Sequence, residues 1–202
     1  MNISDKLEGL AEVFSNEFLL NPYLAYTEHG LHALFFNFLL TKLGQEKITL
    51  FSEWKEQRVC LIQKEYPTAA NFERSRRQNW DISILECPLK SLKENEPNSF
   101  DFFSLEAVFE FGLNASFKHL ESDIERLAHK DANLKNAYIM HFYRLSEAGA
   151  RFSSRDCSTN SKSILFPDQI EQQIKGKKVT VFYALVDLTQ KHTSIFKKIS
   201  GQ

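Results

Sequence analysis

The sequence has few of the features that mark secreted, membrane-bound or metal-thiolate proteins. Its three cysteines, Cys60, Cys87 and Cys157, are widely spaced and form no C-x-x-C pair, so neither a disulfide framework nor a cysteine-bound zinc site is expected. No uncharged apolar run approaches the roughly 18 residues of a membrane-spanning helix, and the first residues lack a basic segment followed by an apolar core. We therefore expect a soluble, cytoplasmic protein that does not bind membranes.

Charge and short motifs exclude further classes. The chain carries 25 Lys and Arg against 26 Asp and Glu, for a formal net charge of −1. Such a balance gives no strong basic field, so any binding of nucleic acid would need a local basic patch. A Gly-rich phosphate-binding loop and a serine nucleophile elbow are also missing from the sequence.

What the sequence does contain fits one well-packed domain over residues 1–202. A chain of 202 residues with 43% hydrophobic content is long enough for one core and short for two. Its 18 phenylalanines indicate that the core is rich in aromatic rings.

Helices are expected first along the chain. Apolar residues at helical spacing predict a helix over 3–19. Asn21 as N-cap, Pro22 in the first turn and Gly44 as the stop predict a second helix over 21–44. A third, short helix is expected over 48–57.

Strands alternate with helices in the rest of the chain. Strands are expected over 59–66, 80–86, 105–113, 136–145 and 178–188, and helices over 116–130 and 167–176. This order predicts an α/β fold with a mixed central β-sheet flanked by helices. The chain then divides into N-terminal helices (1–57) and an α/β core (58–190).

Three acids interrupt apolar patterns in these elements. Alternate strand residues share a face, so Glu110 lies on one face of the apolar strand "AVFEFGLN" and Asp81 opens the strand "WDISILE". Glu28 falls on the apolar stripe of the second helix. A buried carboxylate is costly unless it is paired or binds a metal, so one shared site explains all three best. The alternatives are that Glu28 pairs with a buried Arg or His and that Asp81 caps a turn.

The order of these segments resembles a known family. The helix with Glu28, the strand "LIQKEYP", the segment "R-x-x-x-W-D-I-S-I", the strand "AVFEFGL" and the helix "LESDIERL" are similar to the core of the PD-(D/E)XK, or restriction-endonuclease-like, nuclease superfamily. The resemblance implies a restriction-endonuclease-like fold and a Mg²⁺-dependent (or Mn²⁺-dependent) nuclease acting on DNA. By position, Glu28, Asp81 and Glu110 would hold the metal. Many nucleases of this family act as dimers, which makes a homodimer an expectation here too.

The family lysine, two residues after the strand acid, is missing, because Gly112 stands at that position. Such a lysine would stabilise charge on the phosphate or orient the attacking water. One explanation is that Lys118 or Lys64 replaces it, and we count Lys118 with the catalytic residues. The other is that the site has lost its activity. Asn114 shares the face of Glu110 and is a candidate for holding a water, although an amide does not supply the missing charge.

Basic residues near the acids are candidates for binding the phosphate backbone. Arg74, Arg76 and Arg77 precede Asp81, and the alternative is that they belong to a solvated loop. Arg126 and Lys130, on the helix after Glu110, are less direct candidates for the same role.

Two histidines stand beside Glu28 in "EHGLH", at a spacing that lets imidazoles converge on a helix. The segment is not H-E-x-x-H, and the sequence suggests no third ligand. We therefore expect His32 in the core, His29 exposed, and no zinc.

The sequence leaves two other functions open. Gly112 and the near-neutral charge are compatible with a catalytically inactive nuclease fold that serves as a nucleic-acid or protein interaction module. If the three acids were far apart in space, a purely structural domain would be favoured.

Overall fold

A computed structural model of the chain describes residues 3–68, 79–90, 103–147, 151–159, 164–189 and 193–201. A mixed seven-stranded sheet forms its centre, in the order β3-β4-β5-β6-β8-β9 with β7 added beside β6. These strands are β3 (Ile62–Pro67), β4 (Asn79–Leu85), β5 (Leu105–Leu113), β6 (Leu134–Ser146), β7 (Cys157–Ser158), β8 (Val179–Asp187) and β9 (Thr193–Ser200). β5, β6 and β8 run parallel, and the outer pairs β3–β4, β4–β5 and β8–β9 are antiparallel.

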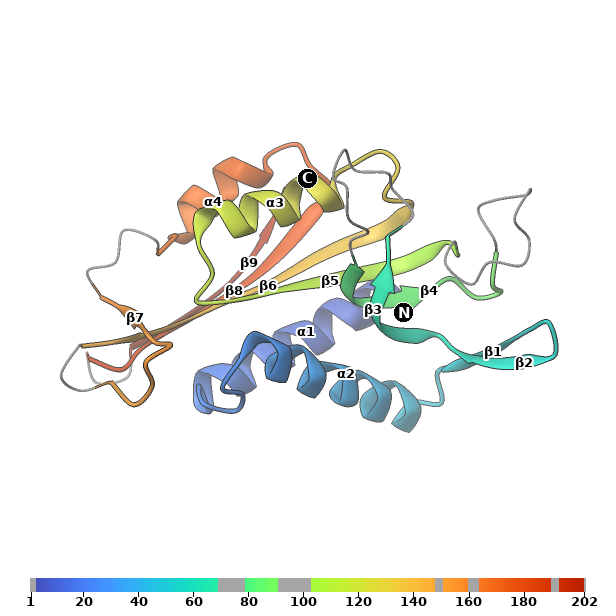
Figure 1. The fold of residues 1–202 in the computed structure, drawn as a ribbon, viewed down its shortest axis with the longest axis horizontal. Coiled ribbons are helices and arrows are strands. Elements are labelled where there is room, and N and C mark those ends of the chain that lie inside the picture. The colour runs from blue at the N-terminus through green and yellow to red at the C-terminus, as the bar shows by residue number, and fades with distance from the viewer. Residues whose placement is uncertain are drawn as a thin grey trace.

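Helices cover both faces of the sheet (Figure 1). α1 (Ile3–Leu20) and α2 (Glu28–Gln45) lie on one face, and α3 (Phe117–Leu127) and α4 (Pro167–Ile174) lie on the other. Each face has its own apolar core, and the two cores use alternate residues of the central strands. The predicted α/β class, with a mixed sheet flanked by helices and two helices ahead of it, is confirmed. Among the described residues, no helix combines the length and the apolar character needed to cross a membrane.

β5 is a central strand, and its sequence explains its place. Seven of its nine residues are buried, because helices pack on both faces and strands pair on both edges. Phe109 and Phe111 point toward α2, whereas Val108 belongs to the core under α3. Glu110 shares the α3 side and is only 3% exposed, so a carboxylate does stand in the middle of the sheet.

The second helix begins later than expected. Its N-cap is Thr27, whose hydroxyl accepts a hydrogen bond from the Gly30 N–H at 3.0 Å, and not Asn21. The buried guanidinium of Arg144 donates to the carbonyls of Pro22, Ala25 and Tyr26 at 2.9 to 3.3 Å. These carbonyls accept hydrogen bonds from Arg144 in place of helical N–H groups, and α2 begins at Glu28.

The predicted helix over 48–57 is wrong. This segment forms a β-hairpin of β1 (Phe51–Trp54) and β2 (Gln57–Cys60). The two turn residues, Lys55 and Glu56, both have positive φ (51° and 63°), as a type I′ turn requires. A Lys-Glu turn lacks the glycine or asparagine that usually reveals this geometry, so the sequence did not indicate it.

The other differences concern strand limits. The predicted strand 59–66 is divided between β2 and β3, and the expected boundary at 57/58 falls inside the hairpin. β9 was not predicted and carries the sheet past residue 190. It is an edge strand with mostly exposed or half-buried residues, including two lysines, so it lacks the apolar run that marked the inner strands.

Candidate functional site

Two acids accept hydrogen bonds from backbone N–H groups of β5, at the point where β4 stops pairing with β5. β4 and β5 pair as far as Ile82 and Phe109. Beyond that point, Asp81 Oδ2 accepts the Phe111 N–H at 2.8 Å, and Glu28 Oε2 accepts the Leu113 N–H at 3.1 Å. Alternate N–H groups of a strand point to the same edge, so the two carboxylates replace the missing strand partner. Each carboxylate is thus held by one oxygen.

Glu110 stands one residue before Phe111 on β5 and meets the basic side chain of Arg126 on α3. Its Oε1 is 3.0 Å from Arg126 Nη2, and the same nitrogen donates to Asp123 Oδ1 at 2.7 Å. The Arg126 guanidinium also lies over the ring of Trp80, with 5.4 Å to its centroid. A buried ion pair therefore joins the sheet to α3.

His119 extends this network by one helical turn. Its Nε2 is 3.1 Å from Asp123 Oδ2 and 3.3 Å from the carbonyl oxygen of Phe111. The hydrogen bond with Asp123 raises the pKa of His119 to about 9, against the effect of burial. The imidazole is therefore protonated at neutral pH and adds a second positive charge beside the acids.

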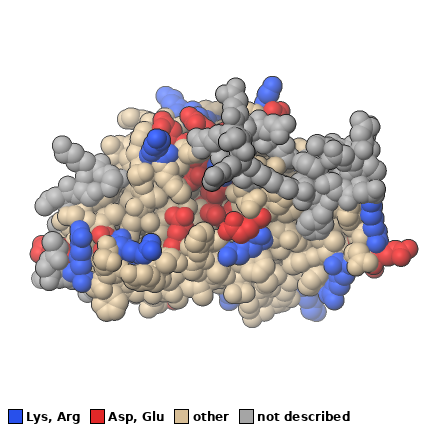
Figure 2. All heavy atoms as spheres, in the orientation of Figure 1, with Lys and Arg blue, Asp and Glu red and all other residues tan. Residues whose placement is uncertain are grey.

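Burial, together with nearby negative charge, raises the pKa of two of the acids. Burial raises the pKa of Asp81 to about 6, and the hydrogen bond from the Phe111 N–H opposes that rise. Negative charges on Glu28, Glu65 and Asp123 add to it. Burial also raises the pKa of Glu110 well above its usual value, and the nearby Asp81 reinforces the shift. Figure 2 shows Asp and Glu side chains gathered on the middle of this face of the molecule.

Gly112, where the sequence resemblance implies a lysine, has no room for a side chain. A Cβ there would lie 2.8 Å from His141 Nδ1 and 3.0 Å from Ala115 Cβ. His141 is fully buried, and its Nε2 is 2.9 Å from the hydroxyl of Tyr143. The imidazole of β6 therefore occupies the place where a lysine stem would begin.

The two expected replacements for that lysine, Lys118 and Lys64, both have exposed side chains. Lys118 is exposed, and it sits about 100° around α3 from the stripe of His119 and Asp123, since each helical residue turns by that angle. Lys64 is exposed on β3, and its positive charge helps to lower the pKa of His32. Within the part of the chain that the structure describes, Arg126 and His119 are the cationic side chains that contact the cluster. The spacing of His119, Asp123 and Arg126 on one helical face was the signal in the sequence that could have found them.

A pocket of about 410 Å³ opens beside Glu28. Arg155 lines it together with His29 and Asn114, and the Arg155 guanidinium lies 5.4 Å from the ring centroid of Tyr26. The Asn114 amide is already used, because it donates to the Arg155 carbonyl at 2.7 Å and accepts the Arg144 N–H at 2.8 Å. Asn114 therefore shapes the pocket wall, and one donor and one acceptor position of its amide already have partners.

Other expected contacts have mixed outcomes. Arg74, Arg76 and Arg77 lie outside the described residues. His32 is buried and His29 exposed, as predicted, and burial lowers the pKa of His32 to about 4. The sequence suggested no third ligand for these histidines, whereas the structure brings Glu65 to them.

No protein-family model, curated protein or solved structure matches this chain.

Proposed function

We propose that the protein is a Mg²⁺-dependent nuclease of the PD-(D/E)XK type that acts on DNA, with Glu28, Asp81 and Glu110 as metal ligands. The observation that carries the proposal is the meeting of three acids, from α2, β4 and β5, at the point where β4 and β5 separate. In this proposal the mixed sheet is a restriction-endonuclease-like core.

The donor set fits a hard divalent cation. All three ligands are carboxylates, which Mg²⁺ and Mn²⁺ prefer, and the backbone of β5 holds two of them in place. The pKa values of Asp81 and Glu110 are raised mainly by burial and further by the negative charge of nearby acids, and a bound divalent cation would offset that negative charge. A bound Mg²⁺ would neutralise charge on the phosphate and acidify the attacking water.

The chain's own cations take the electrostatic role of the absent lysine in this proposal. Arg126 and the protonated His119 project from α3 toward the acids, and both can stabilise charge that develops on a phosphate. Arg155, in the pocket beside Glu28, is a candidate for holding a neighbouring phosphate of the strand. Arg74, Arg76 and Arg77 keep that role as a prediction from sequence. We place this activity in the cytoplasm, with a homodimer as the arrangement that would cut both strands.

A cleavage assay tests the proposal. We expect the purified protein to cut DNA with Mg²⁺ or Mn²⁺ and to stop in EDTA. Asp81→Asn should lower the rate by roughly 100-fold or more, the scale on which one electrostatic group acts in a transition state. Glu121→Gln, at an exposed position of α3, is the matched control and should cut normally. An Asp81→Asn variant as active as wild type would overturn the assignment.

The alternative is a nuclease fold that binds nucleic acid without cutting it, and one observation favours it. Arg126 already forms an ion pair with Glu110, so this acid has a positive partner without any metal. In that case the wild-type protein would bind DNA equally well with Mg²⁺ and with EDTA and would leave it intact. Cleavage that needs Mg²⁺ would exclude this alternative.

A further inference from the structure

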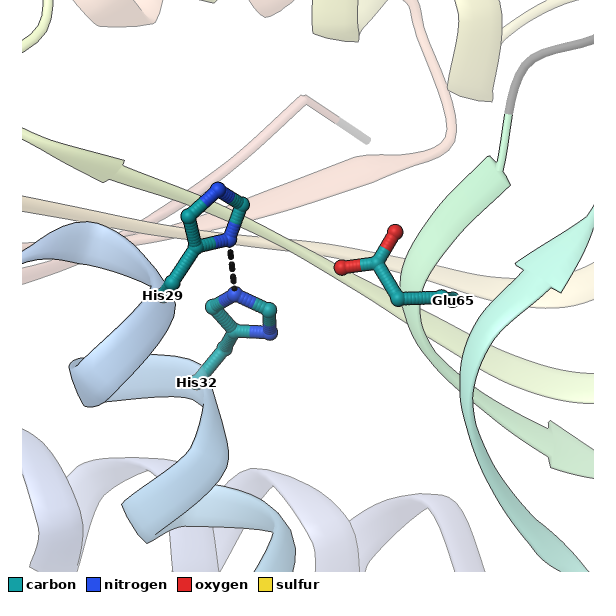
Figure 3. Close-up of side chains that lie close together, drawn as sticks. All are labelled: His29, His32 and Glu65. Carbon is teal, nitrogen blue, oxygen red and sulfur yellow. Dashed lines mark hydrogen bonds between the residues drawn. The ribbon is translucent and has the colours of Figure 1, made fainter.

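A second cluster of ligand-type side chains lies next to the carboxylates. His29 and His32 stand one turn apart on α2, and His29 Nδ1 is 2.8 Å from His32 Nε2. Glu65 of β3 turns its carboxylate toward the two rings (Figure 3). One ligand atom from each of the three residues lies within 4.8 Å of the others.

The backbone explains why Glu65 points there. The register of β3 and β4 puts Glu65 opposite Asp81, but this pair is missing from the ladder between Lys64↔Ile82 and Tyr66↔Trp80. Glu65 has a positive φ of 56°, which a residue with a side chain rarely adopts. Such strain persists where the surroundings hold it and is a known feature of ligand sites.

The distances suit a transition metal. Zinc binds imidazole nitrogen and carboxylate oxygen at about 2.0–2.2 Å, which places tetrahedral ligand atoms roughly 3.3 Å apart. The two facing nitrogens and the Glu65 carboxylate reach that spacing by small rotations of His29 and Glu65, which are both exposed. His32 is fully buried, so the surrounding side chains hold this ligand in place.

We propose that His29, His32 and Glu65 bind a transition-metal ion such as Zn²⁺, with a fourth coordination position open to solvent. Two imidazoles and one carboxylate favour zinc over magnesium, which prefers oxygen ligands. Three protein ligands with an open position are typical of exchangeable or catalytic zinc sites and not of closed structural ones. The site shares no ligand with the proposed nuclease centre, and it holds or fails independently of that function.

Two features of the surroundings weaken metal binding at this site. The Lys64 ammonium lies close enough to act on His32 and opposes a cation. Among the described residues, His32 Nδ1 has no hydrogen-bond partner, so the site lacks the second acceptor that usually strengthens a histidine ligand. We therefore expect a metal ion that chelators remove readily, and tighter binding in Lys64→Gln.

Cobalt substitution tests the site directly. Co²⁺ titrated into the metal-free protein should give the visible absorption of a four-coordinate nitrogen and oxygen site, saturating at one equivalent, and Zn²⁺ should displace it. His29→Ala and Glu65→Ala should each weaken Co²⁺ binding by about tenfold or more, since even outer-shell losses cost 10- to 100-fold. Both positions are exposed, so these variants keep the core intact, which circular dichroism checks.

Matched variants separate the two centres. His129→Ala, a histidine beyond the end of α3, and the double variant Asp81→Asn/Glu110→Gln should keep the Co²⁺ absorption. Absorption that is absent in wild type, or that survives in both His29→Ala and Glu65→Ala, would overturn the proposal. Absorption lost only in the Asp81/Glu110 variant would overturn it too, because the metal would then sit on the carboxylates.

Discussion

At the scale of single residues, Gly112 shows how a missing motif residue can have a spatial cause. The motif lysine needs a side chain that starts where His141 of β6 already lies, 2.8 Å from the position of a Cβ. The positive charge of the region comes instead from α3, through Arg126 and His119. Packing between β5 and β6 thus leaves no room for a side chain at position 112.

Replacing Gly112 by alanine should destabilise the protein. The added methyl group meets a buried imidazole and Ala115, and overpacking of this kind costs about 1–3 kcal/mol. Urea unfolding measures the change. Gly9→Ala is the matched control, because nothing lies within 4 Å of its Cβ and alanine should stabilise α1 by about 0.5–1 kcal/mol. If both variants are stabilised alike, the packing argument fails.

Asp81, a proposed metal ligand, should reduce the free energy of unfolding at neutral pH. Its pKa is about 6 in the folded protein and lower when unfolded, so the folded state binds the proton more tightly. Stability contributed by this group is therefore greatest below the unfolded pKa and is lost as pH rises through about 6. We expect Asp81→Asn to raise the free energy of unfolding at pH 7, and the gain to shrink as pH falls from 6 toward 4.

Thermal or urea unfolding across that pH range checks this expectation. In the Asp81→Asn variant, the new amide oxygen would still accept the Phe111 N–H, so the substitution removes mainly the charge. Glu121→Gln, which changes an exposed carboxylate in the same way, should alter stability little at any of these pH values. A loss of stability in Asp81→Asn at pH 7 would contradict the cost assigned to burying this charge among other acids.

At the scale of elements, the site depends on how two segments begin. α2 has its N-cap at Thr27 because Arg144 binds the carbonyls before it, which puts Glu28 in the first turn. A carboxylate is favoured there by the helix dipole. β4 separates from β5 at Asp81, which leaves two N–H groups of β5 for the acids. These two starting points place Glu28 and Asp81 beside the free edge of β5.

The β1–β2 turn provides a direct test at this scale. Lys55 and Glu56 both have positive φ, so Lys55→Asn with Glu56→Gly should stabilise the hairpin, because asparagine and glycine adopt positive φ at a lower steric cost. A helix over 48–57 would respond in the opposite way, since glycine in a helix costs roughly 0.5–1 kcal/mol. The sign of the change in the free energy of unfolding therefore decides between the two structures.

At the scale of the whole molecule, the layers of the fold bring the acids together. α2 lies on one face of the sheet and α3 on the other, and β5 runs between them (Figure 1). Glu28 reaches the edge of β5 from one layer, and Arg126 and His119 reach Glu110 and Phe111 from the other. The proposed centre thus lies where four elements meet.

The parts of the fold and site that could be predicted are those that leave a pattern in nearby residues of the sequence. Glu110 and Glu28 interrupt apolar patterns, so the sequence alone marked them, and the buried inner strands were found from their apolar runs. The late start of α2 depends on Arg144, more than a hundred residues away, and Glu65 joins His29 and His32 through an unusual φ. Neither leaves a local pattern, so only the three-dimensional structure reveals them.

The central claim is that Glu28, Asp81 and Glu110 form one cation site, and calorimetric titration with Mn²⁺ tests it most directly. We expect saturable binding to the wild-type protein that disappears in Asp81→Asn/Glu110→Gln and survives in His29→Ala. Equal Mn²⁺ binding by the wild-type and double-variant proteins would contradict the account, because the cation would then be held without the carboxylates at its centre.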